Sequence, residues 1–404
     1  MDKILKFIWL TQMGISPPKL KELFNFFGSV ENIYLSQNYD MFYKLRQKDK
    51  DMLMNKSLDD AYAILERCKE CGARVLTYDD ELYPEALKHI DSPPYVLYIK
   101  GRNIDLNKEF CIGVVGTRYS TSYGGNITAA FCSEMAKRGI MVVSGMARGI
   151  DSVAAYATLK AGGETVAVLG CGIDIVYPLE NKTLYQNIEK RGMLISEYPP
   201  GVRGATWTFP RRNRIIAGLS RGVIVIEGSE KSGSMITARF AEEFNRDVFA
   251  VPRNIDEGTL GGTNALIKEG AIPMTKISDL LEQYPELNNR ERKRRGYIYQ
   301  QKTMDEAEIS SIKPIDEIKN NKNEKSEQLK MISDDNIDIS LIIEKTTNDV
   351  EKSIIKFISK DVKHIDNIAD SLGMNSSELS TSLCVLEMMG LIEQLPGRCY
   401  RIKR

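Results

Sequence analysis

The hydrophobic residues between positions 106 and 285 follow two alternating patterns. Short apolar runs rich in valine and isoleucine are typical of parallel strands covered on both faces, and longer segments with helical spacing separate them. The predicted strands are Cys111–Val115, Met141–Ser144, Thr165–Leu169, Met193–Ser196, Gly222–Glu227 and Val248–Val251. The predicted helices are Tyr123–Arg138, Ile150–Ala161, Asn213–Leu219, Ser234–Asn245 and Thr263–Lys268. This alternation predicts an α/β fold with a doubly wound, Rossmann-like sheet that binds ligands beyond the carboxyl ends of its strands.

Residues 1–72 have the pattern of short helices, and residues 73–105 form a connector to the sheet domain. Apolar residues recur at helical spacing from Ile8 to Phe27, on both sides of a break that contains Gly14 and Ser16. This outline is typical of a helix-hairpin-helix or SAM-like domain, which can grip a DNA backbone through its hairpin amides. Ser16 stands where a second hairpin glycine is usual, so a structural or docking role is equally consistent with the pattern.

The C-terminal part of the chain contains two further regions. Residues 286–348 are rich in lysine, glutamate, asparagine and serine, which predicts a flexible charged linker. Residues 349–404 regain helical periodicity in three segments and end in a hairpin, which together predict a winged helix. Its third helix, from Ser376, has no lysine or arginine in its opening turns. Duplex binding and protein docking therefore both remain open for this domain.

Composition limits the kinds of partner. The chain has 55 basic and 55 acidic residues, so its formal net charge is zero and any site for a polyanion must be local. No apolar stretch approaches the roughly 18 residues that span a membrane. The first ten residues lack a secretory signal, and the seven cysteines fit a reducing compartment, so we expect a cytoplasmic protein.

The segment Phe209–Arg214 reads Phe-Pro-Arg-Arg-Asn-Arg and contains three arginines in four positions. It precedes the predicted helical residues Ile215 to Leu219. Cations at the start of a helix oppose its dipole. They are reasonable there if an anion is bound by the free backbone amides and the guanidinium groups together. The segment therefore predicts a phosphate-binding site.

Three other strand-to-helix turns carry cations in the same way. They are Gly116-Thr117-Arg118, Ser144 to Asp151 with Arg148, and Gly228 to Ser234 with Lys231. The first two are consistent either with phosphate nests or with ordinary tight turns, and Asp151 either supports its turn or pairs with Arg148. The third resembles a P-loop but lacks the required Lys-Ser/Thr after its second glycine, so we expect no NTP hydrolysis. It can hold a phosphate or simply cap a helix.

We find no catalytic constellation in the sequence. The two histidines, His89 and His364, lie outside the sheet domain, and Glu197 and Asp174 have no evident nucleophile or metal ligand beside them. We therefore predict a protein that binds anions, is not an enzyme and needs no metal or cofactor.

Together the motifs resemble those of the DNA-processing protein A family (DprA, also called Smf). The segments that carry the resemblance are Gly116–Arg118, Ser144–Asp151, Gly170–Asp174 with Tyr177 and Pro178, Phe209–Ile215 and Ser232–Ala238. It covers residues 1–285 and the winged helix. The resemblance implies an extended Rossmann domain that binds and protects single-stranded DNA and forms a homodimer. It also implies loading of the RecA recombinase during natural transformation and homologous recombination.

By this likeness Gly116, Thr117 and Arg118 belong to the strand-binding pocket, and physical reasoning adds the other turns. The predicted DNA-binding residues are Gly116, Thr117, Arg118, Ser144, Gly145, Arg148, Phe209, Arg211, Arg212, Asn213, Arg214, Lys231, Ser232, Gly233 and Ser234. Phe209 or Trp207 would stack on bases. The alternative is a nucleotide-processing enzyme of the phosphoribohydrolase-like Rossmann class, although its motif glutamate is missing. A transcription regulator acting through the winged helix is a third hypothesis.

Overall fold

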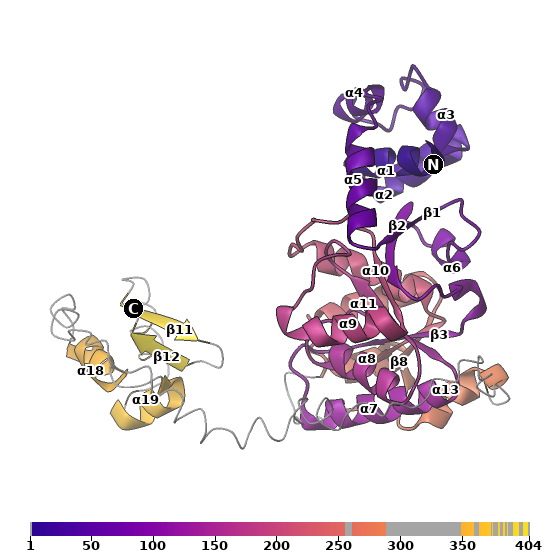
Figure 1. The fold of residues 1–404 in the computed structure, drawn as a ribbon. Coiled ribbons are helices and arrows are strands. Elements are labelled where there is room, and N and C mark those ends of the chain that lie inside the picture. Colours follow the sequence, from indigo (N-terminus) through magenta and orange to yellow (C-terminus); the bar gives the residue numbers. More distant parts are fainter. Residues whose placement is uncertain are drawn as a thin grey trace. The chain divides into compact units, whose positions relative to one another are not determined.

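The computed structural model describes residues 2–254, 261–287, 349–358, 363–372, 374, 379, 383, 386, 391–395 and 399–402. The chain forms two compact units, Met1–Thr303 and Met304–Arg404, and each is described by itself (Figure 1). The predicted linker, residues 286–348, lies almost wholly outside the described residues. None of the described helices is long and apolar enough to cross a membrane.

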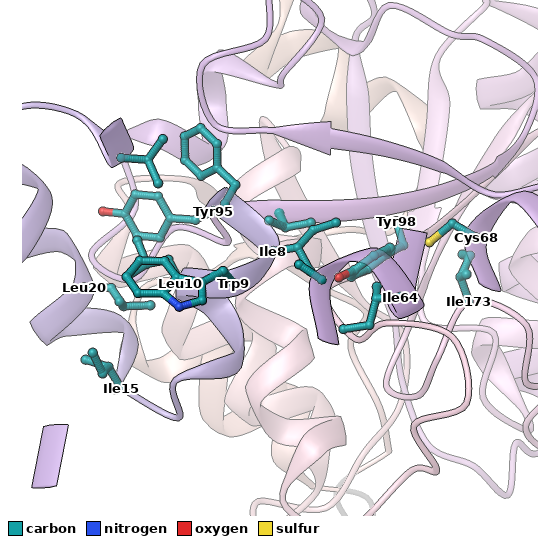
Figure 2. Packing of buried hydrophobic residues seen from close by; sticks show 14 of the residues in the cluster. Ile8, Trp9, Leu10, Ile15, Leu20, Ile64, Cys68, Tyr95, Tyr98 and Ile173 are labelled. Atoms are coloured by element: carbon teal, nitrogen blue, oxygen red, sulfur yellow. The ribbon is translucent and has the colours of Figure 1, made fainter. Parts of the chain in front are cut away.

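The N-terminal part of the first unit is a group of short helices. They are α1 (Asp2–Gln12), α2 (Pro17–Phe27), α3 (Val30–Leu35), α4 (Gln47–Met54) and α5 (Asp59–Glu70). The loop between α1 and α2 contains Gly14 at φ 62°, so the predicted helix, hairpin and helix are confirmed. The helices share one apolar cluster with the edge of the sheet, including Ile64 and Cys68 of α5, Tyr98 and Ile173 (Figure 2). This common core fixes the helices to the sheet.

The centre of the first unit is a nine-stranded sheet in the order β1-β2-β6-β5-β4-β3-β7-β8-β9. The strands are β1 (Arg74–Thr77), β2 (Val96–Gly101), β3 (Cys111–Val115), β4 (Met141–Ser144), β5 (Thr165–Leu169), β6 (Met193–Ser196), β7 (Gly222–Val225), β8 (Asp247–Ala250) and β9 (Ile272–Pro273). Strands β3 to β9 pair in parallel, and β1 and β2 add an antiparallel edge. The predicted α/β fold with a doubly wound sheet is confirmed. The segment expected to be a connector contributes two strands to the same sheet.

Helices cover both faces of the sheet (Figure 1). One apolar cluster joins the strands to α6 (Glu85–Lys88), α10 (Thr208–Leu219), α11 (Gly233–Glu243) and α12 (Gly262–Glu269). On the other face the strands contact α7 (Ser122–Lys137), α8 (Ile150–Lys160), α9 (Lys182–Arg191) and α13 (Ile277–Gln283). Short 3₁₀ turns occur at η1 (Leu106–Lys108), η2 (Leu179–Asn181) and η4 (Pro285–Leu287). This arrangement leaves the loops at the carboxyl ends of the strands exposed along one edge.

Two helices differ from the predictions. Helix α10 begins at Thr208, five residues before the predicted Asn213, so the arginines lie within its first turns rather than ahead of it. Pro210 is compatible with this start, because the first turn of a helix makes no use of its own amide protons. Helix α9 was not predicted. Its sequence is mostly polar, and Tyr185 and Ile188 are its only fully buried residues.

The second unit contains α18 (Asp349–Ile358), α19 (Ile365–Leu372) and a three-stranded sheet. The strands are β10 (Lys363–His364), β11 (Ile392–Leu395) and β12 (Cys399–Ile402), in the order β10-β12-β11. Leu379, Leu383 and Leu386, the described residues of the predicted third helix, are buried against α18 and α19 in one apolar cluster. The opening turns of that helix lie outside the described residues.

Candidate nucleic-acid interface

The order of the strands reverses between β3 and β7, where the chain turns to opposite faces of the sheet. Ligands of doubly wound sheets bind beside the carboxyl ends of the strands at such a point. The loops after β3, β4, β5, β6 and β7 all lie at this edge, and the predicted site residues lie in these loops, at the end of β4 or in the first turns of α10 and α11. The edge has an inner layer of buried ion pairs and an outer layer of exposed side chains.

The first buried group lies under the start of α7. Glu227, which follows β7, accepts hydrogen bonds from the amide and hydroxyl of Thr121 and pairs with the guanidinium of Arg253. The amide of Thr117 donates to the carbonyl of Glu227 at 2.8 Å. The sequence left the turn at Gly116 open between a phosphate nest and a tight turn, and the structure shows that Glu227 already accepts hydrogen bonds from the amides of Thr117 and Thr121.

The second buried group lies under the start of α8. The carboxylate of Asp151 accepts from the amides of Gly145 (3.1 Å) and Ala147 (3.4 Å). Of the two roles open for Asp151, support of its own turn is therefore the one observed. Arg212 is 4% exposed and donates to the carbonyls of Gly145, at 2.7 Å, and Val168. Burial raises the pKa of Asp151 above its ordinary value, and the nearby Arg212 guanidinium opposes that shift. The hydroxyl of buried Ser144 donates to Val114.

The third buried group joins the end of β6 to α10. Glu197 accepts from Arg214 at 2.6 Å and from Arg211 at 3.2 Å, two partners that the sequence did not indicate. Arg214 is 3% exposed, whereas the side chain of Arg211 is 35% exposed. We call the six inner side chains of these three groups, of which Glu197 is the most exposed at 13%, the floor of the interface: Glu227, Arg253, Asp151, Arg212, Glu197 and Arg214.

An aromatic and cationic cluster lies outside the floor. The guanidinium of Arg118 sits 5.8 Å from the ring centroid of Phe209, and the ring of Tyr177 is 5.0 Å from the same ring. A Cβ at Gly170 would lie 2.6 Å from Cδ1 of Phe209, so only glycine lets this loop pass so close to the ring. Arg118 is exposed and forms no ion pair with any described residue. It is therefore available to a ligand.

Arg148 is also exposed, but it has a partner. Its Nε and Nη2 donate to the two carboxylate oxygens of Glu180, with 3.0 Å between Nη2 and Oε2. The amide of Ile150 donates to the carbonyl of Thr117, which holds the Arg148 loop beside the Arg118 loop. The two arginines therefore belong to one surface.

The start of α11 contributes the last predicted residues. Ser232 is its N-cap without a side-chain capping bond, its first turn has no acidic residue, and Lys231 is exposed. The side chain of Asn213 donates to the carbonyl of Gly233 at 3.1 Å, and Ser232 and Ser234 share a hydrogen bond. Within the described ranges no carboxylate pairs with Lys231 or caps this helix. This turn keeps the features of an anion site.

The rim of the interface is the set of exposed or half-exposed side chains Arg118, Arg148, Tyr177, Phe209, Arg211 and Lys231. The structure brings the predicted residues to one edge, but it buries five of them: Ser144, Gly145, Arg212, Arg214 and Ser234. The structure adds two exposed rings to this edge that the predicted site did not include, Tyr177 (49%) beside Phe209 and Tyr119 (79%). The repeated aromatic residues after β3 and β5 were the available signal.

Comparison with known families identifies the chain. A model described as DNA recombination-mediator protein A matches residues 74–285, and the DprA winged helix domain matches residues 344–398. The chain belongs to the DprA/Smf family. This confirms the resemblance seen in the sequence and establishes the winged helix.

Among the relatives in the DprA/Smf family, one covers nearly the whole chain and others cover part of it. Protein Smf of Synechocystis is 33% identical over 97% of both chains. The DNA processing protein DprA of Bacillus subtilis is 42% identical over 56% of this chain and 76% of that protein. The X-ray structure of DprA from Streptococcus pneumoniae has a TM-score of 0.60 and 35% identity, and it covers 68% of this chain and 95% of that one.

Proposed function

We propose that the rim binds single-stranded DNA and leaves its bonds intact. The observation that carries this proposal is the cluster of Arg118, Phe209 and Tyr177. It combines an unpaired guanidinium with two neighbouring aromatic rings at the ligand-binding edge of a doubly wound sheet. Guanidinium groups bind phosphates, and aromatic rings stack on bases. Membership of the DprA/Smf family, whose relatives are named DNA processing proteins, supports DNA as the ligand.

Exposed rings favour a single strand over a duplex. The side chains of Tyr177 and Trp207 are 49% and 59% exposed. Bases in a duplex are already stacked on one another, so they offer their faces to a protein only when the strands are separated. Phosphate contacts alone would not distinguish the two forms.

The acids at this edge support binding without catalysis. Asp151, Glu197 and Glu227 each neutralise an arginine or accept backbone amides in the floor, so none of the three is free to act as a general base. The alternative, a phosphoribohydrolase-like enzyme, would need a catalytic glutamate, and the glutamate of that motif is missing from this sequence. Release of free base from AMP would nevertheless favour it.

The remaining parts of the proposal follow from the family. We propose that the protein acts in the cytoplasm as a homodimer formed through the Rossmann domain, and that it protects the strand and loads RecA on it. We also propose the domain division inferred from the sequence, with parts 1–72, 73–105, 106–285, 286–348 and 349–404.

Fluorescence anisotropy with a labelled oligothymidylate, the matching duplex and thymidine monophosphate tests the binding. We expect tight binding of the oligonucleotide, weaker binding of the duplex and very weak binding of the monophosphate. The affinity should fall with salt, with a log–log slope of about −0.7 for each neutralised phosphate. Arg118→Ala should lower the affinity and flatten the slope.

Arg138→Ala is the matched control. Arg138 follows the last residue of α7, at the opposite end of the sheet from the interface, and pairs there with Glu134. Arg138→Ala removes one positive charge, as Arg118→Ala does, but away from the interface. The binding curve of this variant should therefore coincide with that of the unchanged protein. Equal effects of Arg118→Ala and Arg138→Ala would contradict the proposed site.

A further inference from the structure

The ion pair between Arg148 and Glu180 differs from the ion pairs of the floor. Both side chains are 52% exposed, and both carboxylate oxygens of Glu180 face the guanidinium. An acid here is unexpected in a surface that we propose for phosphates, because it occupies one of the rim arginines. Glu180 also lies three residues after Tyr177 of the aromatic cluster.

The fold holds Glu180 in this position. The next residue, Asn181, donates from its side chain to the carbonyl of Met146 at 2.9 Å and to the hydroxyl of Ser152 at 2.8 Å. That hydroxyl donates in turn to the carbonyl of Ala147 at 2.6 Å. The turn that carries Glu180 is thus fixed to the loop that carries Arg148, so the pair is built into the site rather than formed by two loose surface chains.

Glu180 does not compensate a buried arginine, whereas Glu197 does. The side chain of Glu197 is only 13% exposed and compensates Arg214, which is 3% exposed, so Glu197 cannot leave without leaving a buried charge uncompensated. Glu180 pairs only with half-exposed Arg148 among the described residues. It can release Arg148 to solvent or to a phosphate without uncovering a buried ion.

We propose that Glu180 is an internal competitor of DNA, which occupies Arg148 in the free protein and is displaced by a strand phosphate. The proposal rests on the proposed function, because it assigns a role within the same rim. Arg118 and Lys231 would anchor the strand and raise the effective concentration of the next phosphate beside Arg148. Glu180 therefore sets the affinity of the rim below what its cations alone would give, which favours later release of the strand.

A double-mutant cycle tests the competition. The variants are Glu180→Gln, Arg148→Gln and the double variant, each titrated with labelled oligothymidylate at low salt. Glu180→Gln should tighten binding roughly two- to fivefold, the size of an exposed ion pair. The gain should disappear in the Arg148→Gln background and shrink as salt is raised.

Glu134→Gln provides the matched control. Glu134 pairs with Arg138 and Lys137 on α7, so this change removes one negative charge and releases an arginine far from the rim. It should leave binding unchanged. A gain equal to that of Glu180→Gln would show a general charge effect, and a gain that persists without Arg148 would also overturn the proposal.

The outcome separates this inference from the proposed function. If the unchanged protein does not bind the oligonucleotide, the proposed function fails. If it binds and Glu180→Gln leaves the affinity unchanged or weaker, only the role of Glu180 is wrong. Equal melting temperatures of the variants would show that folding is not responsible for any difference.

Discussion

The floor and the rim of the interface use the same residue types for opposite purposes. In the floor, Arg212, Arg214 and Arg253 are buried and contact carboxylates or carbonyl groups of the protein itself. In the rim, Arg118 and Lys231 are exposed and unpaired within the described part of the chain. The floor arginines hold loops from different strands together, whereas Arg118 and Lys231 remain available to a ligand. The number of arginines in a motif therefore does not show how many of them reach a ligand.

The largest effect should come from the floor. Arg212→Ala leaves the carbonyls of Gly145 and Val168 without a donor and removes the positive charge near Asp151. We expect a loss of about 3 kcal/mol in the free energy of unfolding, because the buried carboxylate of Asp151 would lose its nearby compensating charge. Urea denaturation measures it. A loss below about 0.5 kcal/mol, the range of ordinary surface substitutions, would show that the floor is not structural.

The rim should show the reverse behaviour. The double variant Arg118→Ala/Lys231→Ala should weaken oligothymidylate binding roughly thirtyfold and flatten the salt slope by about 1.4, because two phosphate contacts are lost. Its urea denaturation curve should match that of the unchanged protein. A double variant that unfolds more easily but binds normally would reverse the assignment of rim and floor.

The aromatic part of the rim can be tested apart from its charge. Tyr177→Ala removes a half-exposed ring next to Phe209 without changing charge. We expect about fivefold weaker binding of the single strand, the lower range for loss of one stacked base, with the salt slope and duplex binding unchanged. Anisotropy titrations at several salt concentrations give both quantities, and a changed slope would speak against stacking.

The smallest effect concerns stability and pH at the Arg148–Glu180 pair. The Arg148 guanidinium holds the pKa of Glu180 below its usual value. The pair therefore stabilises the fold above the unfolded pKa of Glu180, and this contribution is lost as pH falls through the lower folded pKa. Because both side chains are half exposed, Glu180→Gln should change the melting temperature at pH 7 by no more than about 2 °C. A larger decrease would place Glu180 in the floor.

The architecture could be predicted well because the central strands are short, continuous apolar runs. Buried runs such as Cys111–Val115 and Thr165–Leu169 contain hydrophobic residues at successive positions, and their boundaries are those observed. Helix α10 began earlier than predicted because the proline and the arginines resemble a segment that precedes a helix. Strands β1 and β2 join the sheet through antiparallel pairing, which local patterns do not reveal.

The division into floor and rim could not be predicted in the same way. The acids that occupy the arginines are distant in sequence: Glu180 is 32 residues from Arg148, and Glu227 is 26 residues from Arg253. These pairs form only when loops from different strands meet at one edge. Glycine-rich turns indicated where that edge lies, but burial of Arg212 depends on the packing of α10 against the ends of β4 and β5.

Photochemical cross-linking of the unchanged protein to oligothymidylate, followed by mass spectrometry of the adducts, tests the central claim most directly. The account predicts adducts on the rings of the rim, Tyr177 and Phe209, and their loss when an unlabelled single strand competes. Adducts confined to residues outside the carboxyl edge of the sheet would contradict it.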